Sequence, residues 1–356
     1  MKYLFLRACT YTCIAVFLAS CGASRQNEAE TFTAAEWNLQ ALFDGEETGT
    51  EYSEYREASR WGRAQYSGRL TVITQAILKM TESGASSKSA PPDLLGLIEV
   101  ENAEVLEDLA SRLQNGCFWT AFASLPLSPL GIGFISRYPI LEARAHSITI
   151  NEKTAPRPVL EVRLEPGGKP LVFLLCHWKS KLGGGEATES LRRASARVVQ
   201  RRLRELAESE AETPVIVMGD LNENHDEFLR QPYFCALLPD DPKAAAMARN
   251  ARDFLVLSGE KPPRAACFPE GTPALYSPWY NKAGEGSYFF MEEWETIDHI
   301  LLSQSLFDGT GWELGDYQIL KKPPFIANDG APDRYIPRSG RGLSDHLPLL
   351  LVLCLL

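Results

Sequence analysis

The stretch Leu343-Ser344-Asp345-His346-Leu347-Pro348 stands near the C-terminus and leads into an apolar run that continues to residue 353. A short apolar run of this kind is typical of a buried strand. The stretch therefore places an acid and a histidine at the start of a strand. A carboxylate there can hold a metal ion, and an imidazole can transfer a proton. Alone, this pattern is a weak indication of a catalytic site.

Four other polar stretches precede it, and nearly all of their candidate residues lie at the end of an expected strand. In chain order they are Trp37-Asn38-Leu39-Gln40, Leu97-Ile98-Glu99-Val100-Glu101-Asn102, Met218-Gly219-Asp220-Leu221-Asn222 and Glu295-Thr296-Ile297-Asp298-His299. His177 follows a further apolar run. The ordered set predicts a metal-dependent phosphoesterase site that draws on almost the whole chain.

The pattern of expected strands and helices favours an α/β fold. Strands are predicted over residues 36–43, 93–100, 118–123, 131–136, 140–150, 159–164, 171–177, 214–219, 295–303 and 346–353. Helical spacing is found over residues 52–80, 103–113, 186–208 and 244–257. Runs of strands with few helices between them indicate two packed sheets with helices outside, rather than regular βαβ alternation. Such a sandwich would gather the strand ends at one mouth.

Composition sets broad limits on the class of protein. The 356 residues are 45% hydrophobic and 23% charged, which excludes global disorder and a coiled coil. The net charge of −10 argues against tight nonspecific binding to nucleic acid. A nuclease is still compatible with it if a metal ion neutralises the site. The helix predicted over residues 186–208 is basic, but a solvated face explains it better than a nucleic-acid track.

The first residues are expected to direct export. Lys2 and Arg7 precede a short apolar run, which ends at Leu18-Ala19-Ser20-Cys21-Gly22. This pattern resembles a bacterial lipoprotein signal, with cleavage before Cys21 and lipid on that cysteine. Residues 1–20 would be the signal, 21–32 a tether and 33–356 the catalytic domain. The protein would be a lipid-anchored monomer on a bacterial membrane, facing the periplasm or the cell surface. An ordinary secretory signal is the alternative.

The remaining cysteines give little indication of chemistry. Five of the eight follow residue 21, and their spacing matches no metal motif. Cys176 and Cys354 lie in apolar runs and are expected to be core thiols. A disulfide between Cys235 and Cys267 is a further hypothesis.

The candidate residues suit hydrolysis of a phosphoester by a hard cation. Mg²⁺ prefers oxygen ligands, usually one or two carboxylates together with water and substrate phosphate. The oxygen donors in the stretches above are Asn38, Glu99, Asp220, Asn222, Asp298 and Asp345. His177 and His346 would donate hydrogen bonds and handle protons. Each also has an ordinary structural alternative, such as an Asx turn at Asp220 or a strand-end cap at Asn38.

From about Thr33 onward the chain resembles the endonuclease/exonuclease/phosphatase superfamily, whose fold is a four-layered α/β sandwich. The resemblance implies two mainly antiparallel sheets flanked by helices, and it implies Mg²⁺, with Mn²⁺ or Ca²⁺ as alternatives. It places Asn38, Glu99 and Asp345 at the metal. Asp220 would orient or activate the attacking water.

The same resemblance assigns the remaining site residues. Asn222 would hold substrate phosphate or the attacking water, and His346 would pair with Asp298 to handle the proton. His177 would donate to the phosphate. The segment Cys176-His177-Trp178-Lys179-Ser180-Lys181 resembles that of bacterial secreted nucleases, so Lys179 and Lys181 are candidate phosphate contacts, with Arg157 a weaker one.

The chain departs from two branches of the family. The tyrosine of abasic-site endonucleases has no counterpart at Ser128-Pro129-Leu130, and the 5-phosphatase pattern is absent before Asp298. Aromatic residues at 276–280 and 288–290 would either stack on bases or pack in the core. The expected function is an exported Mg²⁺-dependent nuclease acting on DNA or RNA. The alternatives are a phosphoesterase for lipid or inositol phosphates and a non-catalytic surface lipoprotein.

Overall fold

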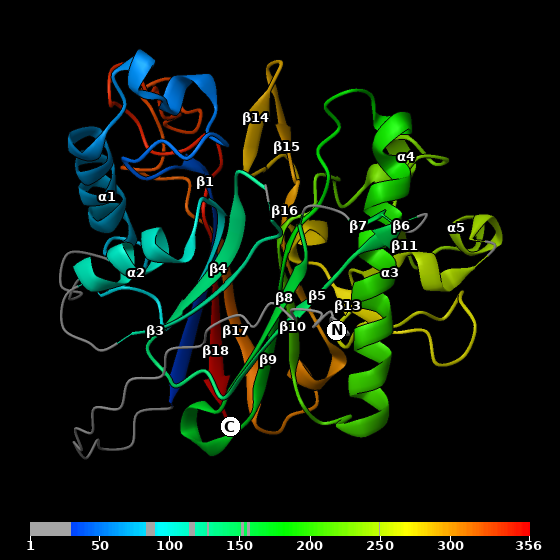
Figure 1. The fold of residues 1–356 in the computed structure, drawn as a ribbon. Helices are drawn as coiled ribbons and strands as arrows, with labels where there is room; N and C mark the ends of the chain where they lie inside the picture. Colours follow the sequence, from blue (N-terminus) through cyan, green and yellow to red (C-terminus); the bar gives the residue numbers. More distant parts are fainter. Residues whose placement is uncertain are drawn as a thin grey trace, which may run out of the picture.

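The computed structural model describes residues 30–82, 90–113, 118–126, 128–150, 153–154, 157–248 and 250–356. Cys21, the expected signal and Cys117 lie outside these ranges. The described residues form two large sheets, as the sequence predicted (Figure 1). The six-stranded sheet has the order β17 (Trp312–Ile319), β18 (Leu349–Leu355), β1 (Thr31–Leu42), β2 (Leu94–Val100), β4 (Gly131–Ser136), β3 (Trp119–Ala123).

The second sheet has eight strands. Their order is β11 (Leu237–Pro239), β12 (Leu255–Ser258), β13 (Ala274–Tyr276), β16 (Asp298–Leu302), β10 (Val215–Asp220), β9 (Leu171–His177), β8 (Val159–Leu164), β5 (Glu142–His146). Most neighbouring pairs in both sheets are antiparallel. The parallel pairs are β1–β2, β9–β10, β11–β12 and β12–β13. Two small hairpins add β6 (Thr149–Ile150) with β7 (Lys153–Thr154) and β14 (Tyr288–Phe290) with β15 (Glu293–Glu295).

Alternation of side chains along the strands builds a core between the sheets. In β10, Ile216 and Met218 face the other sheet, while Val215 and Val217 face outward. Helices then cover both outer faces, with α1 (Arg63–Ile77) and α2 (Ala103–Arg112) on the first sheet and α3 (Gly185–Ser209) on the second (Figure 1). The helix–sheet–sheet–helix order confirms the predicted four-layered sandwich. The remaining helices are α4 (Glu227–Arg230) and α5 (Pro242–Met247).

Two predicted helices differ from the structure. The helix expected over residues 52–80 forms only over α1, because Arg60 in the left-handed region (φ 65°) ends the turns before it. The helix expected over 244–257 is wrong: α5 ends at Met247, and β12 occupies the apolar run that follows it. Strand β12 is buried on both faces, so its continuous apolar sequence resembles that of a buried helix.

The basic helix α3 packs its apolar side on the second sheet, and most of its arginines form ion pairs. The pairs are Arg192–Glu223, Arg193–Glu189, Arg197–Asp253, Arg201–Glu205 and Arg202–Glu161. These charges are therefore largely neutralised by neighbouring acids. Among the described helices, none has both the length and the apolar composition needed to cross a membrane.

Candidate active site

The strand alternation that builds the inter-sheet core also positions the polar residues at its edge. On β1, Phe32 and Ala34 point between the sheets, and Asn38 continues that series at the strand's end. His177, Asp220 and Asp298 occupy equivalent inward positions at the ends of β9, β10 and β16. All four side chains are almost fully buried. Asn38 Nδ2 donates to Asp220 Oδ2 at 3.1 Å, so the two sheets meet directly at this point.

Glu99 reaches the same place through an irregularity in two adjacent strands. By alternation it would face α1 and α2, because Leu95 and Leu97 do. However, Glu99 is in the left-handed region (φ 64°), and the β2–β4 register shifts at this residue. On β1, Gln40 and Ala41 also have positive φ, and the amide N of Ala41 donates to Glu99 Oε2 at 2.8 Å. This pair of bulges turns the carboxylate toward the site.

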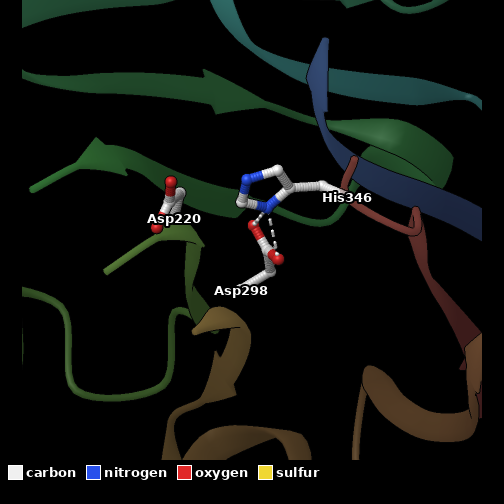
Figure 2. A group of neighbouring side chains, drawn as sticks. All are labelled: Asp220, Asp298 and His346. Atoms are coloured by element: carbon white, nitrogen blue, oxygen red, sulfur yellow. Dashed lines mark hydrogen bonds and ion pairs between the residues drawn. The ribbon is translucent and has the colours of Figure 1, made fainter. Parts of the chain in front are cut away.

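Asp298 and His346 form a hydrogen-bonded dyad, a pairing that the sequence predicted. His346 Nδ1 lies 2.8 Å and 3.0 Å from the two carboxylate oxygens of Asp298 (Figure 2). Burial opposes charge on the imidazole, but the charge and hydrogen bond of Asp298 raise the pKa of His346 well above its usual value. Ser287 Oγ donates to Asp298 Oδ2 at 2.6 Å and fixes the carboxylate from the other side. The contact with Asp298 therefore favours the imidazolium form of His346.

Asp220 lies beside this dyad. Ligand-type atoms of Asp220, Asp298 and His346 are all within 4.8 Å of one another (Figure 2). Burial, followed by the charge of Asp298, raises the pKa of Asp220 to about 7. The backbone N of Asn222 donates to Asp220 Oδ1 at 2.9 Å, and Asn222 Nδ2 donates to the carbonyl of Trp178. A carboxyl group with a pKa near 7 is suited to general acid–base work at neutral pH.

His177 lies between the two groups of acids. Its Nε2 atom is 3.7 Å from Glu99 Oε1 and 3.7 Å from Asp220 Oδ2. Burial lowers the pKa of His177 well below its usual value, and the charges of Arg157, His346 and Lys179 lower it further. The ring is therefore neutral, and 3.7 Å is too long for a hydrogen bond. Nε2 thus faces both carboxylates without a hydrogen bond to either.

The donor set suits a hard divalent cation. Burial raises the pKa of Glu99, and the charge of Asp345 is among the groups that raise it further. A divalent cation between these two carboxylates would remove that repulsion, and carboxylate oxygens are the ligands Mg²⁺ prefers. Asp345 also lies 3.9 Å from Arg334 and 3.9 Å from His346. Asp220, Asp298 and His346 form a second compact group of possible ligands. In that group, Asp298 and His346 already hydrogen-bond to each other.

The three predicted phosphate contacts differ in availability. The Nζ of Lys181 lies 2.7 Å from the buried carboxylate of Glu227, so Lys181 is an ion-pair partner within the fold. Lys179 and Arg157 lie near His177, since the charges of both act on its pKa. Arg157 also donates to the carbonyl of Trp178 at 3.3 Å and acts on the pKa of Glu99. Of the three predicted phosphate contacts, Arg157 and Lys179 therefore remain available at the site.

Sequence reasoning assigned no role to several residues that shape the site. Gln40 Oε1 accepts from the backbone N of Tyr335 and of Asp345, which fixes the loop that carries Asp345. Ser287, just before strand β14, hydrogen-bonds Asp298 of the dyad. Gln40 stood inside a quoted motif, but the contacts of Ser287 depend on tertiary structure alone. The suggested Cys235–Cys267 disulfide is wrong: both thiols are free, the first buried and the second exposed.

Glu36 is the least expected of these residues. It precedes Asn38 by two positions on the inward face of β1, and neither carboxyl oxygen has a hydrogen-bond partner among the described residues. Burial, then the charges of Asp298 and Asp220, raise the pKa of Glu36 well above its usual value. Its surroundings therefore favour the neutral form, which adds no further negative charge beneath the site.

Comparisons with known proteins agree with this arrangement. A model of the endonuclease/exonuclease/phosphatase family matches residues 33–244. A comparison with curated proteins finds no match. The fold is similar to the catalytic domain of human nocturnin, at 17% identity and a TM-score of 0.54, covering 91% of this chain and 94% of that one.

Two further solved structures share the fold. The mannosyl-6-phosphatase Bt3783 of Bacteroides thetaiotaomicron is 17% identical, with a TM-score of 0.51 over 90% of this chain and 99% of that chain. A humanized D. rerio TDP2 is 14% identical, with a TM-score of 0.51 over 91% and 98%. Because these sequence identities are low, the similarity shows a shared fold only.

Proposed function

Because this chain belongs to the endonuclease/exonuclease/phosphatase family, whose members hydrolyse phosphoester bonds, we propose that it is a Mg²⁺-dependent phosphodiesterase acting on nucleic acid. The observation that carries the proposal is the juxtaposition of the Asp298–His346 dyad and Asp220 on one side with Glu99 on the other. His177 faces both sides. Hydrolysis of a phosphoester needs these two functions, a proton-handling group and neutralisation of the phosphoryl charge.

In the proposed reaction, each residue of the site has a separate part. Asp220, with a pKa of about 7, accepts the proton of the attacking water. The imidazolium of His346, held by Asp298, donates a hydrogen bond to a phosphate oxygen and stabilises its developing charge. His177 donates to the phosphate, and Asn222 orients the water. As the oxygen of the water bonds to phosphorus, the bond to the leaving oxygen breaks, and the leaving oxygen takes a proton from solvent. Asn38, Glu99 and Asp345 would hold Mg²⁺, which supplies Lewis-acid neutralisation of the phosphoryl charge.

Two features favour a phosphodiester of nucleic acid as substrate. Arg157 and Lys179 place two cations beside the scissile position, so a substrate with phosphates on either side would be neutralised at more than one point. The net charge of −10 would otherwise repel a polyanion, which makes binding dependent on these cations and on metal. We further propose that Cys21 is lipidated and that the enzyme is exported and membrane-anchored.

A second candidate is a phosphatase or phosphodiesterase for sugar, inositol or lipid phosphates. One observation favours it: a phosphatase of sugar phosphate is among the structures that share the fold. The same dyad and metal ligands would serve either reaction. Substrate choice would then be set by the rim of the site.

The test offers four substrates to the full chain, purified in detergent, with Mg²⁺ or with EDTA. They are single-stranded DNA, RNA, sphingomyelin and mannose 6-phosphate. We expect Mg²⁺-dependent cleavage of a nucleic acid, and a loss of kcat of about 10³-fold in both Asp220→Asn and His346→Ala. Cys176→Ala, a buried thiol on the outward face of β9, is the matched control. Turnover of only a lipid or sugar phosphate would support the second candidate. Activity close to that of the wild type in either variant would refute the assigned roles.

A further inference from the structure

A short hairpin stands directly over the dyad. Its strands β14 and β15 rise above the ends of the two sheets (Figure 1). At its base, the carbonyl of Ser287 accepts from the backbone N of Leu347 at 2.7 Å, and Tyr288 forms an isolated bridge with His346. The hairpin and the catalytic histidine are therefore fixed to each other by backbone contacts.

One face of the hairpin continues the active site with aromatic rings. The ring of Tyr288 lies 4.7 Å from the imidazole of His346, at an angle of 34°. The ring of Phe290 lies 6.1 Å from that of Tyr288 and is nearly parallel to it, at 18°. Tyr288 and Phe290 are two positions apart and so share one face of the strand. Phe289 points the other way and packs on Trp294 at 5.1 Å.

The outer ring of this series is available to a ligand. Phe290 is 48% exposed, so a ligand can reach its ring from solvent. In the other aromatic group foreseen in the sequence, Tyr276 and Trp279 are buried in the core. Tyr280 is 38% exposed, but its ring contacts His225 and not the dyad. The structure thus separates the two groups that the sequence left together.

We propose that Tyr288 and Phe290 form a stacking subsite for a nucleobase of the nucleotide that carries the scissile phosphate. This inference rests on the proposed nuclease function. When the phosphate of a nucleotide binds at His346, its base would lie against Tyr288 and then Phe290. The flat faces of these rings can stack on any base, so the subsite would give no sequence preference. Arg157 and Lys179, whose charges act on His177, supply the cations that single-strand binding requires.

The charges at the hairpin tip argue against the other apolar occupant, a lipid membrane. Met291 is exposed at the turn, but Glu292 and Glu293 follow it directly and are exposed as well. If Met291 entered a membrane, the carboxylates of Glu292 and Glu293 would enter the headgroup region as well. Moving these charges out of water is costly. A flat ring lying along the side of the hairpin avoids this cost.

The experiment compares two single-stranded oligomers of equal length with the full chain in detergent. One carries normal bases, and the other carries abasic sugars throughout. For Phe290→Ala we expect KM on the base-containing oligomer to rise about tenfold, with little change in kcat and no change on the abasic oligomer. Phe290→Trp should restore the KM, and Phe290→Leu, which keeps the apolar volume, should not. Phe289→Ala, on the opposite face of the same strand, is the matched control.

The outcomes separate this inference from the proposed function. Cleavage of the normal oligomer with an unchanged KM in Phe290→Ala would overturn the subsite and leave the nuclease in place. An equal rise in KM on both oligomers would also overturn it, because bases would not be the groups recognised. Absence of cleavage of any oligomer by the wild-type protein would overturn the proposed function. Loss of binding to sphingomyelin vesicles in Phe290→Ala, with KM unchanged, would show a membrane contact instead.

Discussion

At the level of single residues, the site depends on how neighbouring groups set protonation states. Asp298 keeps His346 charged, and the same charge contributes to raising the pKa of Asp220 to about 7. The charge of Asp298 thus favours protonated His346, an acid, and makes Asp220 a stronger base beside it. Ser287 stabilises the ionised form of that carboxylate through a 2.6 Å hydrogen bond. A hydroxyl that touches no substrate therefore acts through the dyad.

This gives a prediction for Ser287→Ala. Loss of one hydrogen bond to a charged group, worth about 1.5–3 kcal/mol, should weaken the hold on Asp298 and lower kcat by about tenfold. KM should change little, and the pH profile of kcat should shift because the imidazolium is less strongly stabilised. Steady-state kinetics between pH 5 and 9 would measure both effects.

The chain offers a matched control for it. Ser277 is also fully buried, but its hydroxyl has no hydrogen-bond partner among the described residues. Ser277→Ala should leave kcat and its pH profile unchanged. If both variants behave alike, the effect of Ser287 is one of packing and not of charge.

The sequence predicts some residues of the site and not others. Asn38, His177, Asp220 and Asp298 were foreseen because strand periodicity and an end position are local properties. Glu99 was foreseen by motif, although the bulge that turns it inward was not. Ser287, Glu36 and the ion pair of Lys181 could not be predicted, since each depends on a partner far away in the sequence.

At the level of elements, ion pairs tie the long helix α3 to the sheet beneath it. Arg202 donates twice to Glu161 of β8, at 2.7 Å and 2.8 Å, and His146 of β5 lies 2.7 Å from the same carboxylate. Burial opposes ionisation of Glu161, but the hydrogen bonds of His146 and Arg202 lower its pKa to about 2. Helix and strands are thus coupled by a nearly buried charge.

The pH dependence of stability follows from this shift. Since the pKa of Glu161 is lower in the folded state, its contribution is complete above the unfolded value of about 4.3 and is lost as pH falls toward about 2. Glu161→Gln should therefore unfold more easily at pH 7, by about 1–3 kcal/mol, with a difference that shrinks below pH 4. Urea unfolding between pH 3 and 7 would measure it.

A neighbouring ion pair provides the comparison. Glu142 on β5 pairs with Arg144, and both side chains are about half exposed. Glu142→Gln should cost well under 1 kcal/mol at every pH, because exposed pairs are screened by solvent. A pH-independent loss in Glu161→Gln would mean that shape, and not charge, accounts for its effect.

At the level of the whole molecule, the site closes the open end of a two-sheet sandwich. The first sheet carries Asn38 and Glu99, and the second carries His177, Asp220 and Asp298. Only a few polar contacts, such as the one between Asn38 and Asp220, join the sheets at this edge. The acids there repel one another, so the edge is stable only to the extent that charge is neutralised. A bound cation should therefore stabilise the whole fold.

Metal removal tests this directly. Mg²⁺ that binds only the native state, at a hundred times its Kd, should raise the free energy of unfolding by about 2.7 kcal/mol over EDTA. Glu99→Gln should abolish the gain, and it should unfold at a higher temperature than wild type in EDTA, because a buried repelling carboxylate is gone. Glu101→Gln is the control, since that carboxylate accepts from the backbone N of Asp44 at 2.6 Å and should leave the gain intact. A full Mg²⁺ shift in Glu99→Gln would place the cation elsewhere, and the acids around Asp220 would become its expected ligands.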